Sequence, residues 1–199
     1  MDTIWMETFE GTTLDERLHW FCEPNHWKVG QGALEIQPEA GTDFWQRTHY
    51  GFRRDNGHFL YFETAANFIL STQVRFFPAH QYDQAGLMVR LSSEDWLKTS
   101  VEAESEGPSR LGAVVTRSGY SDWSTQNFSA SVNQINLRIE RAGADYIVEF
   151  EETPGHWTQL RVAHLERAAD ACVQCGLYAC SPIAAGFRAE FDQLSLKIL

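Results

Sequence analysis

The chain has 199 residues, 43% of them hydrophobic, with a formal net charge of −11 and a sequence pI of about 5.0. This is enough for one β-sandwich with a sizeable core, so we expect a single domain over residues 1–199. An acidic chain repels phosphate backbones, which argues against a nucleic-acid partner. No apolar run reaches the roughly 18 residues of a membrane span.

The first residues, Met1 to Trp5, contain neither a basic region nor an apolar run of the kind that begins a signal peptide. We therefore expect a cytoplasmic protein without membrane contact. Residues 1–9 are apolar-rich and predict an edge strand, and residues 14–20 are compatible with one helical turn. Residues 27–29 and 33–36 flank Gly30-Gln31-Gly32, which is a hairpin signal.

The densest aromatic stretch is TDFWQRTHYGF, residues 42–52. A strand here has two mixed faces: Asp43, Trp45, Arg47 and His49 on one, and Phe44, Gln46, Thr48 and Tyr50 on the other. Neither face is purely apolar, so this is not an ordinary half-buried strand. Two interpretations remain open. The polar groups bond to neighbouring loops, or the strand faces a ligand, because small-molecule sites mix rings with polar groups in this way.

Two strands are expected next, at residues 58–63 and 68–77. The Asn56-Gly57 dipeptide before them is a strong hairpin signal. The second strand alternates, and Pro78 ends it. Its predicted buried row is Phe68, Leu70, Thr72, Val74 and Phe76.

Residues 83–104, DQAGLMVRLSSEDWLKTSVEAE, read as two strands joined by a turn, because apolar residues recur with a period of two. That period predicts four core side chains: Leu87, Val89, Leu97 and Val101. The same parity assigns four polar side chains to the opposite face: Gln84, Arg90, Lys98 and Glu102. Such a row is either a solvated surface or the floor of a binding site.

The pairing of these two strands follows from charge. Pairing Leu91 with Leu97 places Arg90 opposite Lys98, which is repulsive. Pairing Leu91 with Asp95 instead places Arg90 opposite Trp96 and Gln84 opposite Glu102. We expect the second register.

The rest of the chain continues in short strands. Residues 111–116 predict a strand covered on both faces, and residues 135–162 predict a three-stranded meander. RSGYSDWS at residues 117–124 predicts a loop, which either caps the core or carries function. Strands are expected again at residues 174–180 and 187–198, after a short helical turn at 166–170. No stretch has the amphipathic pattern of a helix, so the sequence predicts an all-β sandwich.

The four cysteines are Cys22, Cys172, Cys175 and Cys180. Cys172 and Cys175 have redox spacing, but a redox pair needs a helix N-terminus. Their surroundings read as a strand, on which residues three apart point to opposite faces. We therefore expect buried, unbridged thiols. The scattered histidines and cysteines form no metal-ligand pattern, and nothing in the sequence requires a cofactor.

Several segments together resemble a known family. They are Trp27 with Gly32-Ala33-Leu34, residues 42–52, YDQAGLMVR at 82–90, WLKTSVE at 96–102, VVT at 114–116, YSDWS at 120–124 and GLYACSP at 176–182. In combination they resemble the regulation-of-enolase-like family, a domain-of-unknown-function group in the concanavalin A-like lectin/glucanase superfamily. The resemblance spans nearly the whole chain. It implies a jelly-roll of two antiparallel sheets, one of them concave, and in related jelly-rolls the concave sheet binds sugars.

Catalysis has weaker support in the sequence. The glucanases of that superfamily carry their acids as Glu-x-Asp-x-x-Glu on one strand, and this chain lacks the motif. A serine hydrolase needs a Gly-x-Ser-x-Gly elbow, which is also missing. A glycoside hydrolase is therefore the less favoured interpretation.

Two hypotheses for function follow. In the first, the protein is a non-catalytic jelly-roll that binds a carbohydrate or sugar-like metabolite on its concave sheet. In the second, it is a regulatory module that binds a protein partner. The expected ligand-binding residues are Trp45, Arg47, Gln84, Arg90, Lys98, Glu102, Asp122 and Trp123. A concave pocket at Gln84, Lys98 and Glu102 favours the first hypothesis, and a flat apolar patch favours the second.

Overall fold

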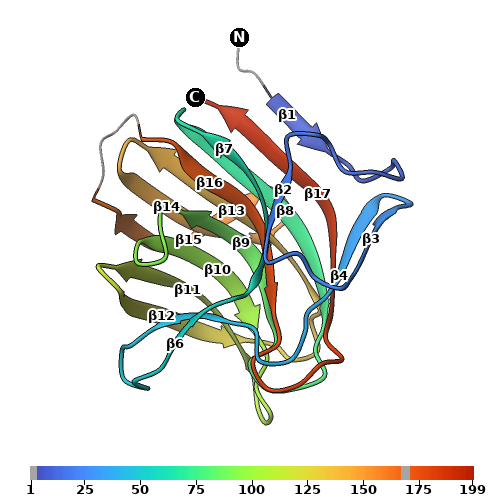
Figure 1. Ribbon diagram of the computed structural model, residues 1–199, viewed down its shortest axis with the longest axis vertical. Coiled ribbons are helices and arrows are strands. Elements are labelled where there is room, and N and C mark those ends of the chain that lie inside the picture. The colour runs from blue at the N-terminus through green and yellow to red at the C-terminus, as the bar shows by residue number, and fades with distance from the viewer. Residues whose placement is uncertain (1–3, 167–170) are drawn as a thin grey trace.

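The computed structural model describes residues 4–166 and 171–199, and within these ranges every helix or strand assigned is a β-strand (Figure 1). The strands form two large antiparallel sheets, so the predicted all-β jelly-roll sandwich is confirmed. No helix long and apolar enough to cross a membrane is present in the described ranges.

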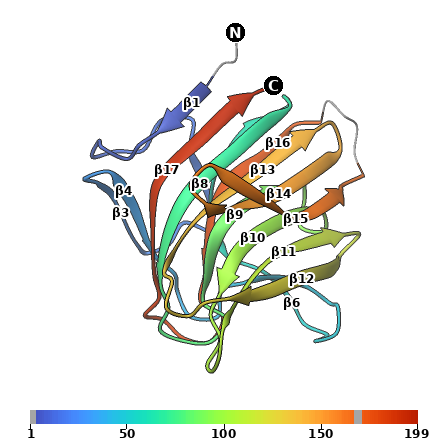
Figure 2. The same cartoon turned by 180° about the vertical axis from the view of Figure 1, so that it is seen from behind.

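The eight-stranded sheet is nearest the viewer in Figure 2. In spatial order it consists of β15 (His156–His164), β14 (Asp145–Thr153), β13 (Gln134–Ala142), β8 (Phe68–Phe77), β17 (Arg188–Ile198), β4 (Ala33–Gln37) and β3 (His26–Gly30). β1 (Ile4–Glu7) pairs with another part of β17. The predicted 135–162 meander is therefore confirmed, as is the hairpin around Gly30-Gln31-Gly32.

The seven-stranded sheet forms the second layer. In spatial order it consists of β12 (Tyr120–Phe128), β11 (Ser109–Arg117), β10 (Trp96–Glu102), β9 (Gln84–Arg90), β16 (Val173–Cys180), β7 (His58–Thr64) and β2 (His19–Phe21). A small ribbon of β5 (Phe44–Gln46) and β6 (Arg53–Asp55) is separate from both sheets. The segment that carries β6 crosses the lower part of the seven-stranded sheet in Figure 1.

The core lies between the two sheets, and strand alternation decides which side chains enter it. Leu87, Val89, Leu97 and Val101 are all at most 1% exposed, which confirms their predicted place in the core. The alternating row predicted for β8 is also buried from end to end. The register of the central hairpin is the predicted one, with Arg90 opposite Trp96 and Gln84 opposite Glu102.

The segment 42–52 departs from the prediction of one long strand. Only Phe44–Gln46 is a strand, because Arg47 and His49 adopt left-handed backbone conformations, with φ of 55° and 62°. These two residues reverse the chain, so that Arg53–Asp55 pairs back onto β5. The hairpin predicted at Asn56-Gly57 is wrong as well. β6 and β7 do not pair, and the amides of these two residues donate instead to the Asp43 carbonyl.

The loop predicted at residues 117–124 is also wrong. Ser118 and Gly119 have φ of 49° and 73°, the paired positive values of a tight type I′ hairpin turn, and β12 begins directly afterwards at Tyr120. Residues 14–20 contain a single turn, closed by the Leu18 amide and the Asp15 carbonyl, and no helix. Of the helical turn predicted at 166–170, residues 167–170 lie outside the described residues.

All four cysteines are free thiols, but they are not all buried. Cys175 and Cys180 lie inside β16 and are buried. Cys172 precedes the strand and is exposed, as is Cys22. The prediction of buried thiols is therefore wrong for Cys172, because β16 begins at Val173 and leaves Cys172 outside the strand.

A matched pair of substitutions measures how much a buried core side chain contributes to the free energy of unfolding. We expect Val89→Ala to lower the free energy of unfolding by about 2 kcal/mol, because two buried methyl groups are lost and a cavity remains. Val162→Ala removes the same atoms from an exposed strand position and should cost less than about 0.5 kcal/mol. Urea unfolding monitored by tryptophan fluorescence provides both values. Equal losses in the two variants would contradict the two-sheet core.

Candidate functional site

Residues 42–57, which we call the flap, cover the outer face of the seven-stranded sheet. A second apolar cluster fills the space between the flap and the sheet: Phe44, Trp45, Phe59, Met88, Trp96, Val114, Tyr178 and Cys180. β9 is consequently buried along its entire length, because one of its faces lies in the main core and the other under the flap. The polar row predicted on this face is therefore enclosed by protein.

The flap is held in place by hydrogen bonds from its polar groups. The guanidinium of Arg90 on β9 donates to Asp55 on β6 over 2.7 Å and lies 4.5 Å from the ring centre of Phe21. The Gln46 amide donates to the Ser121 hydroxyl, and the Gln46 side chain donates to the Ser93 carbonyl. These bonds join the flap to three neighbouring strands or turns of the sheet.

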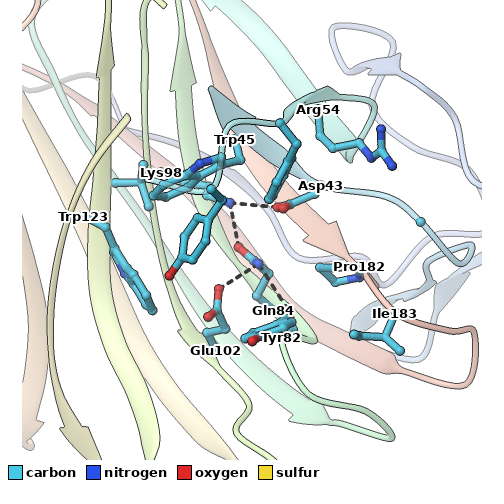
Figure 3. A pocket seen from close by; sticks show the side chains of 14 residues that line it. Asp43, Trp45, Arg54, Tyr82, Gln84, Lys98, Glu102, Trp123, Pro182 and Ile183 are labelled. Carbon is cyan, nitrogen blue, oxygen red and sulfur yellow. Dashed lines mark hydrogen bonds and ion pairs between the residues drawn. The ribbon is translucent and has the colours of Figure 1, made fainter. Parts of the chain in front are cut away.

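A cavity of about 450 Å³ lies beside this cluster. Its walls come from the flap, from β9 to β12, and from the two segments 82–84 and 182–183 (Figure 3). The lining residues are Gly41, Asp43, Trp45, Tyr50, Phe52, Arg54, Tyr82, Gln84, Lys98, Glu102, Val114, Trp123, Pro182 and Ile183. The lining therefore combines aromatic walls with a small number of charged and polar groups, as ligand sites do.

The polar groups of the cavity form one connected network. The Lys98 ammonium donates to Gln84 Oε1 over 2.7 Å and lies 3.4 Å from Asp43 Oδ1. Gln84 Nε2 in turn donates to Glu102 Oε2 over 2.9 Å. Figure 3 shows these contacts as dashed lines. Gln84 thus connects two ionisable residues, Lys98 and Glu102, that lie too far apart on one strand to touch.

The Gln84 amide is fully used by the protein. Its oxygen accepts from Lys98 and from the Tyr178 hydroxyl, and its nitrogen donates to Glu102 and to the Tyr82 carbonyl. A primary amide has two donor hydrogens and two acceptor lone pairs, so all four positions are occupied. The groups left to meet a ligand are the Asp43 carboxylate, the Lys98 ammonium and the Glu102 carboxyl.

Burial dominates the electrostatics of Glu102. It raises the pKa of the Glu102 carboxyl to about 8, against the opposing effect of the Lys98 charge and with smaller upward contributions from Asp43 and Glu104. At neutral pH this carboxyl is largely protonated, so it can donate a hydrogen bond. Lys98 is itself buried and lies near the rings of Trp96 and Tyr178, at 5.8 and 5.4 Å from their centres.

The structure brings together five of the eight predicted site residues: Trp45, Gln84, Lys98, Glu102 and Trp123. The other three do not line this cavity. Arg90 shares the face of the sheet but anchors the flap through Asp55, and Arg47 bonds the Gly119 carbonyl. Asp122 lies in an adjoining hollow and pairs with Arg161 over 2.9 Å.

Further lining residues were not among the expected ligand-binding residues: Asp43, Arg54, Tyr82, Pro182 and Ile183. A signal for Asp43 was present, because strand parity places it on the same face as Trp45. Tyr82 gives no such signal, since its left-handed backbone (φ of 70°) lies outside any strand pattern. In the described part of the chain, no group of three or more His, Cys, Asp or Glu residues is arranged to hold a metal ion.

The raised pKa of Glu102 links stability to pH. Between about pH 4.5 and pH 8 the folded protein keeps a proton that the unfolded chain has released, so the free energy of unfolding falls as pH rises through this window. We expect Glu102→Gln, which is neutral throughout, to remove a loss of roughly 3–4 kcal/mol between pH 5 and pH 8. Urea unfolding at pH 5, 6, 7 and 8 measures it.

Glu63→Gln is the matched control for this experiment. Glu63 also accepts a hydrogen bond from a glutamine, Gln174, on the same sheet, but the pair is exposed. Its substitution should leave the slope of stability against pH unchanged. A wild-type slope retained in Glu102→Gln would show that Glu102 does not hold the proton.

A further prediction concerns the ion pair between Arg90 and Asp55. We expect Asp55→Asn to lower the free energy of unfolding by about 3–5 kcal/mol, because it leaves the Arg90 charge buried without its counter-charge. Arg90→Met combined with Asp55→Leu removes both charges and should recover most of this loss. Urea unfolding of the wild type, of Asp55→Asn and of the double variant tests this, and a double variant no more stable than Asp55→Asn would contradict the pairing.

This chain is similar to a family of proteins and to a yeast protein over most of its length. The family described as "Protein of unknown function (DUF1349)" matches residues 20–198. A yeast protein, "Regulation of enolase protein 1" of Saccharomyces cerevisiae, is 33% identical over 177 residues, which cover 89% of this chain and 87% of the yeast protein.

Solved structures agree on the fold. A functionally unknown protein from Saccharomyces cerevisiae superposes with a TM-score of 0.84 at 31% identity, over 92% of this chain and 97% of that one. The GH43B protein of a Bacteroides ovatus xyloglucan locus gives 0.79 at 21% identity, over 98% of this chain and 39% of that one. At this lower identity the similarity concerns the fold alone. Because the family match covers residues 20–198 and the yeast protein is 33% identical over 89% of this chain, the chain belongs to the DUF1349 family.

Proposed function

We propose that the cavity beside the flap binds a carbohydrate or a sugar-like metabolite. The observation that carries this proposal is the convergence of Asp43, Lys98 and Glu102 on one cavity whose other walls are aromatic. Sugars present hydroxyl groups around their edge and apolar C–H groups on their ring faces. Rings such as Trp45 and Trp123 suit those faces, and the three charged or titratable groups suit the hydroxyls.

The arrangement supports binding better than hydrolysis. Glycoside hydrolysis needs two carboxyl groups on either side of the bond to be cleaved. Here the Asp43 carboxylate is paired with the Lys98 ammonium, and Glu102 is held by Gln84. Both acids are therefore engaged in a network that orients hydrogen-bonding groups. The glycoside hydrolase structures share the fold at 21% identity or less, so the proposal does not depend on them.

A second candidate function is docking of a protein partner at the cavity mouth. Four large apolar side chains that line the cavity are exposed: Tyr50, Phe52, Tyr82 and Ile183. Exposed rings gathered in one place are typical of protein interfaces. The yeast relative is named for the regulation of enolase, which makes enolase the first partner to examine. The cavity below these rings is the reason we rank a small ligand first.

Ligand binding is tested with a thermal-shift screen of sugars and sugar-like metabolites, followed by calorimetry on each hit. We expect Lys98→Met and Glu102→Gln each to weaken binding by about 1–3 kcal/mol, or roughly 5- to 150-fold, because each removes a partner of a buried polar group. Lys28→Met is the control and should bind as the wild type does, because the exposed Lys28 pairs with Glu35 on the other sheet, away from the cavity.

Two results would contradict the carbohydrate proposal. One is a screen without any stabilising sugar, and the other is unchanged affinity in both cavity variants. In either case the partner hypothesis is tested directly, by titrating enolase from the same organism into the wild type and into Tyr50→Ala. Loss of enolase binding in Tyr50→Ala would then support docking at the cavity mouth.

A further inference from the structure

The charges on the cavity wall do not cancel. Besides two tyrosines, the charged or titratable side chains that line the cavity are Asp43, Arg54, Lys98 and Glu102. Asp43 and Lys98 form an ion pair, with 3.4 Å between Oδ1 and Nζ, so their charges compensate each other. Glu102 is largely uncharged at neutral pH, because burial raises its pKa to about 8. Arg54 is therefore left with an uncompensated positive charge, in a chain whose net charge is −11.

Neighbouring acidic side chains are engaged elsewhere in the protein and do not neutralise Arg54. The Asp55 carboxylate pairs with Arg90, and the Glu104 carboxylate pairs with Arg110. Among the described residues, none forms a hydrogen bond or an ion pair with the Arg54 side chain. Its charge and its N–H donors therefore remain for a ligand.

The flap places Arg54 on the side of the cavity. Arg54 on β6 lies directly opposite Trp45 on β5, and residues opposite each other in antiparallel strands share a face. Asp55, the next residue along β6, has the opposite parity and anchors the flap to the sheet. Arg54 is exposed whereas Lys98 is buried, so the two cations mark the mouth and the floor of the cavity.

The hydrogen-bonding groups that remain free in the cavity are mostly donors. The Lys98 ammonium keeps one N–H after its two bonds within the network. The protonated Glu102 carboxyl can donate as well. The Tyr50 and Tyr82 hydroxyls bond no other residue in the described part of the chain, and the Arg54 guanidinium adds N–H groups. A ligand with an acidic group supplies the acceptors that this set of donors needs.

We infer that the ligand is an acidic sugar, whose carboxylate or phosphate group binds Arg54 at the cavity mouth. Its hydroxylated ring lies deeper, against Lys98 and Glu102. A guanidinium matches a carboxylate or a phosphate with two parallel hydrogen bonds, which are stronger than bonds to neutral hydroxyls. This inference rests on the proposed function and adds the chemical class of the sugar and the residue that selects it.

Calorimetry with sugars that differ in charge tests the inference. The probes are glucose, galactose and mannose, each with its uronic acid and its 6-phosphate. In the set that binds, we expect an acidic sugar to bind at least about 10-fold more tightly than its neutral parent, because a charge-assisted contact is added. A gain for the uronic acid alone identifies a carboxylate ligand, and a gain for the 6-phosphate alone identifies a phosphate ligand.

Two substitutions on β6 assign the gain. Arg54→Gln should bring the acidic sugar down to the affinity of its neutral parent. Arg53→Gln is the matched control, because it removes the same charge from the adjacent residue. The Arg53 guanidinium pairs with Glu94, and Arg53 does not line the cavity, so the gain should persist. Both residues are on the surface, so both variants should fold, which circular dichroism and the unfolding midpoint check.

The outcomes separate the inference from the function on which it rests. Equal affinity for acidic and neutral sugars, or a gain that survives in Arg54→Gln, overturns the inference and leaves the carbohydrate proposal standing. A gain lost equally in both variants also overturns it, because the gain would then come from the overall charge of the flap. Failure of every sugar to bind overturns both. A gain lost in Arg54→Gln and kept in Arg53→Gln supports both.

Discussion

The structure depends on covering the outer face of the seven-stranded sheet. β9 and β10 are buried on both faces, and a sheet that is buried on both faces needs two partners. The eight-stranded sheet is one partner and the flap is the other. Without the flap, Met88, Trp96 and Tyr178 would lose their cover. The cavity lies between the flap and the end of these strands that carries Gln84 and Glu102.

Polar side chains attach the flap to the seven-stranded sheet. A flap with only three residues in each of its strands has little backbone pairing of its own. Its side chains supply the attachment instead, through Arg90 with Asp55 and through Gln46 with the neighbouring turns. The same requirement explains the Gln84 network. A buried ammonium and a buried carboxyl need partners, and one amide serves both.

Much of this fold could be predicted from sequence, because period-two patterns and charge placement act locally. The pairing of Gln84 with Glu102 followed from avoiding an Arg90–Lys98 clash, and it is the pairing observed. The flap could not be predicted in this way. Its direction is set by two non-glycine residues with positive φ, Arg47 and His49, and the Arg47 side chain is held by the Gly119 carbonyl, 72 residues away in sequence. Local propensity carries no information about such contacts.

The candidate site was predictable only in part for the same reason. Lys98, Gln84 and Glu102 share a strand face, so parity alone groups them. Arg90 has the same parity but lies at the other end of β9, where the flap covers it. Asp122 and Trp123 were expected in a loop, because the sequence around Ser118-Gly119 is rich in loop residues. In the structure these two residues form a tight turn, and β12 follows directly. Parity identifies a face, and only the tertiary structure shows where along that face a cavity opens.

The division of the cavity between sheet and flap has an evolutionary consequence. The floor residues Gln84, Lys98 and Glu102 belong to strands whose other face builds the core, so changes there put folding at risk. The flap contributes Asp43, Trp45, Tyr50 and Arg54 from a segment that pairs with neither large sheet. Insertions and substitutions in the 47–52 loop can therefore alter the shape of the roof while the sandwich stays the same. The 47–52 loop is therefore the part of the cavity that sequence change can reshape at the least cost to folding.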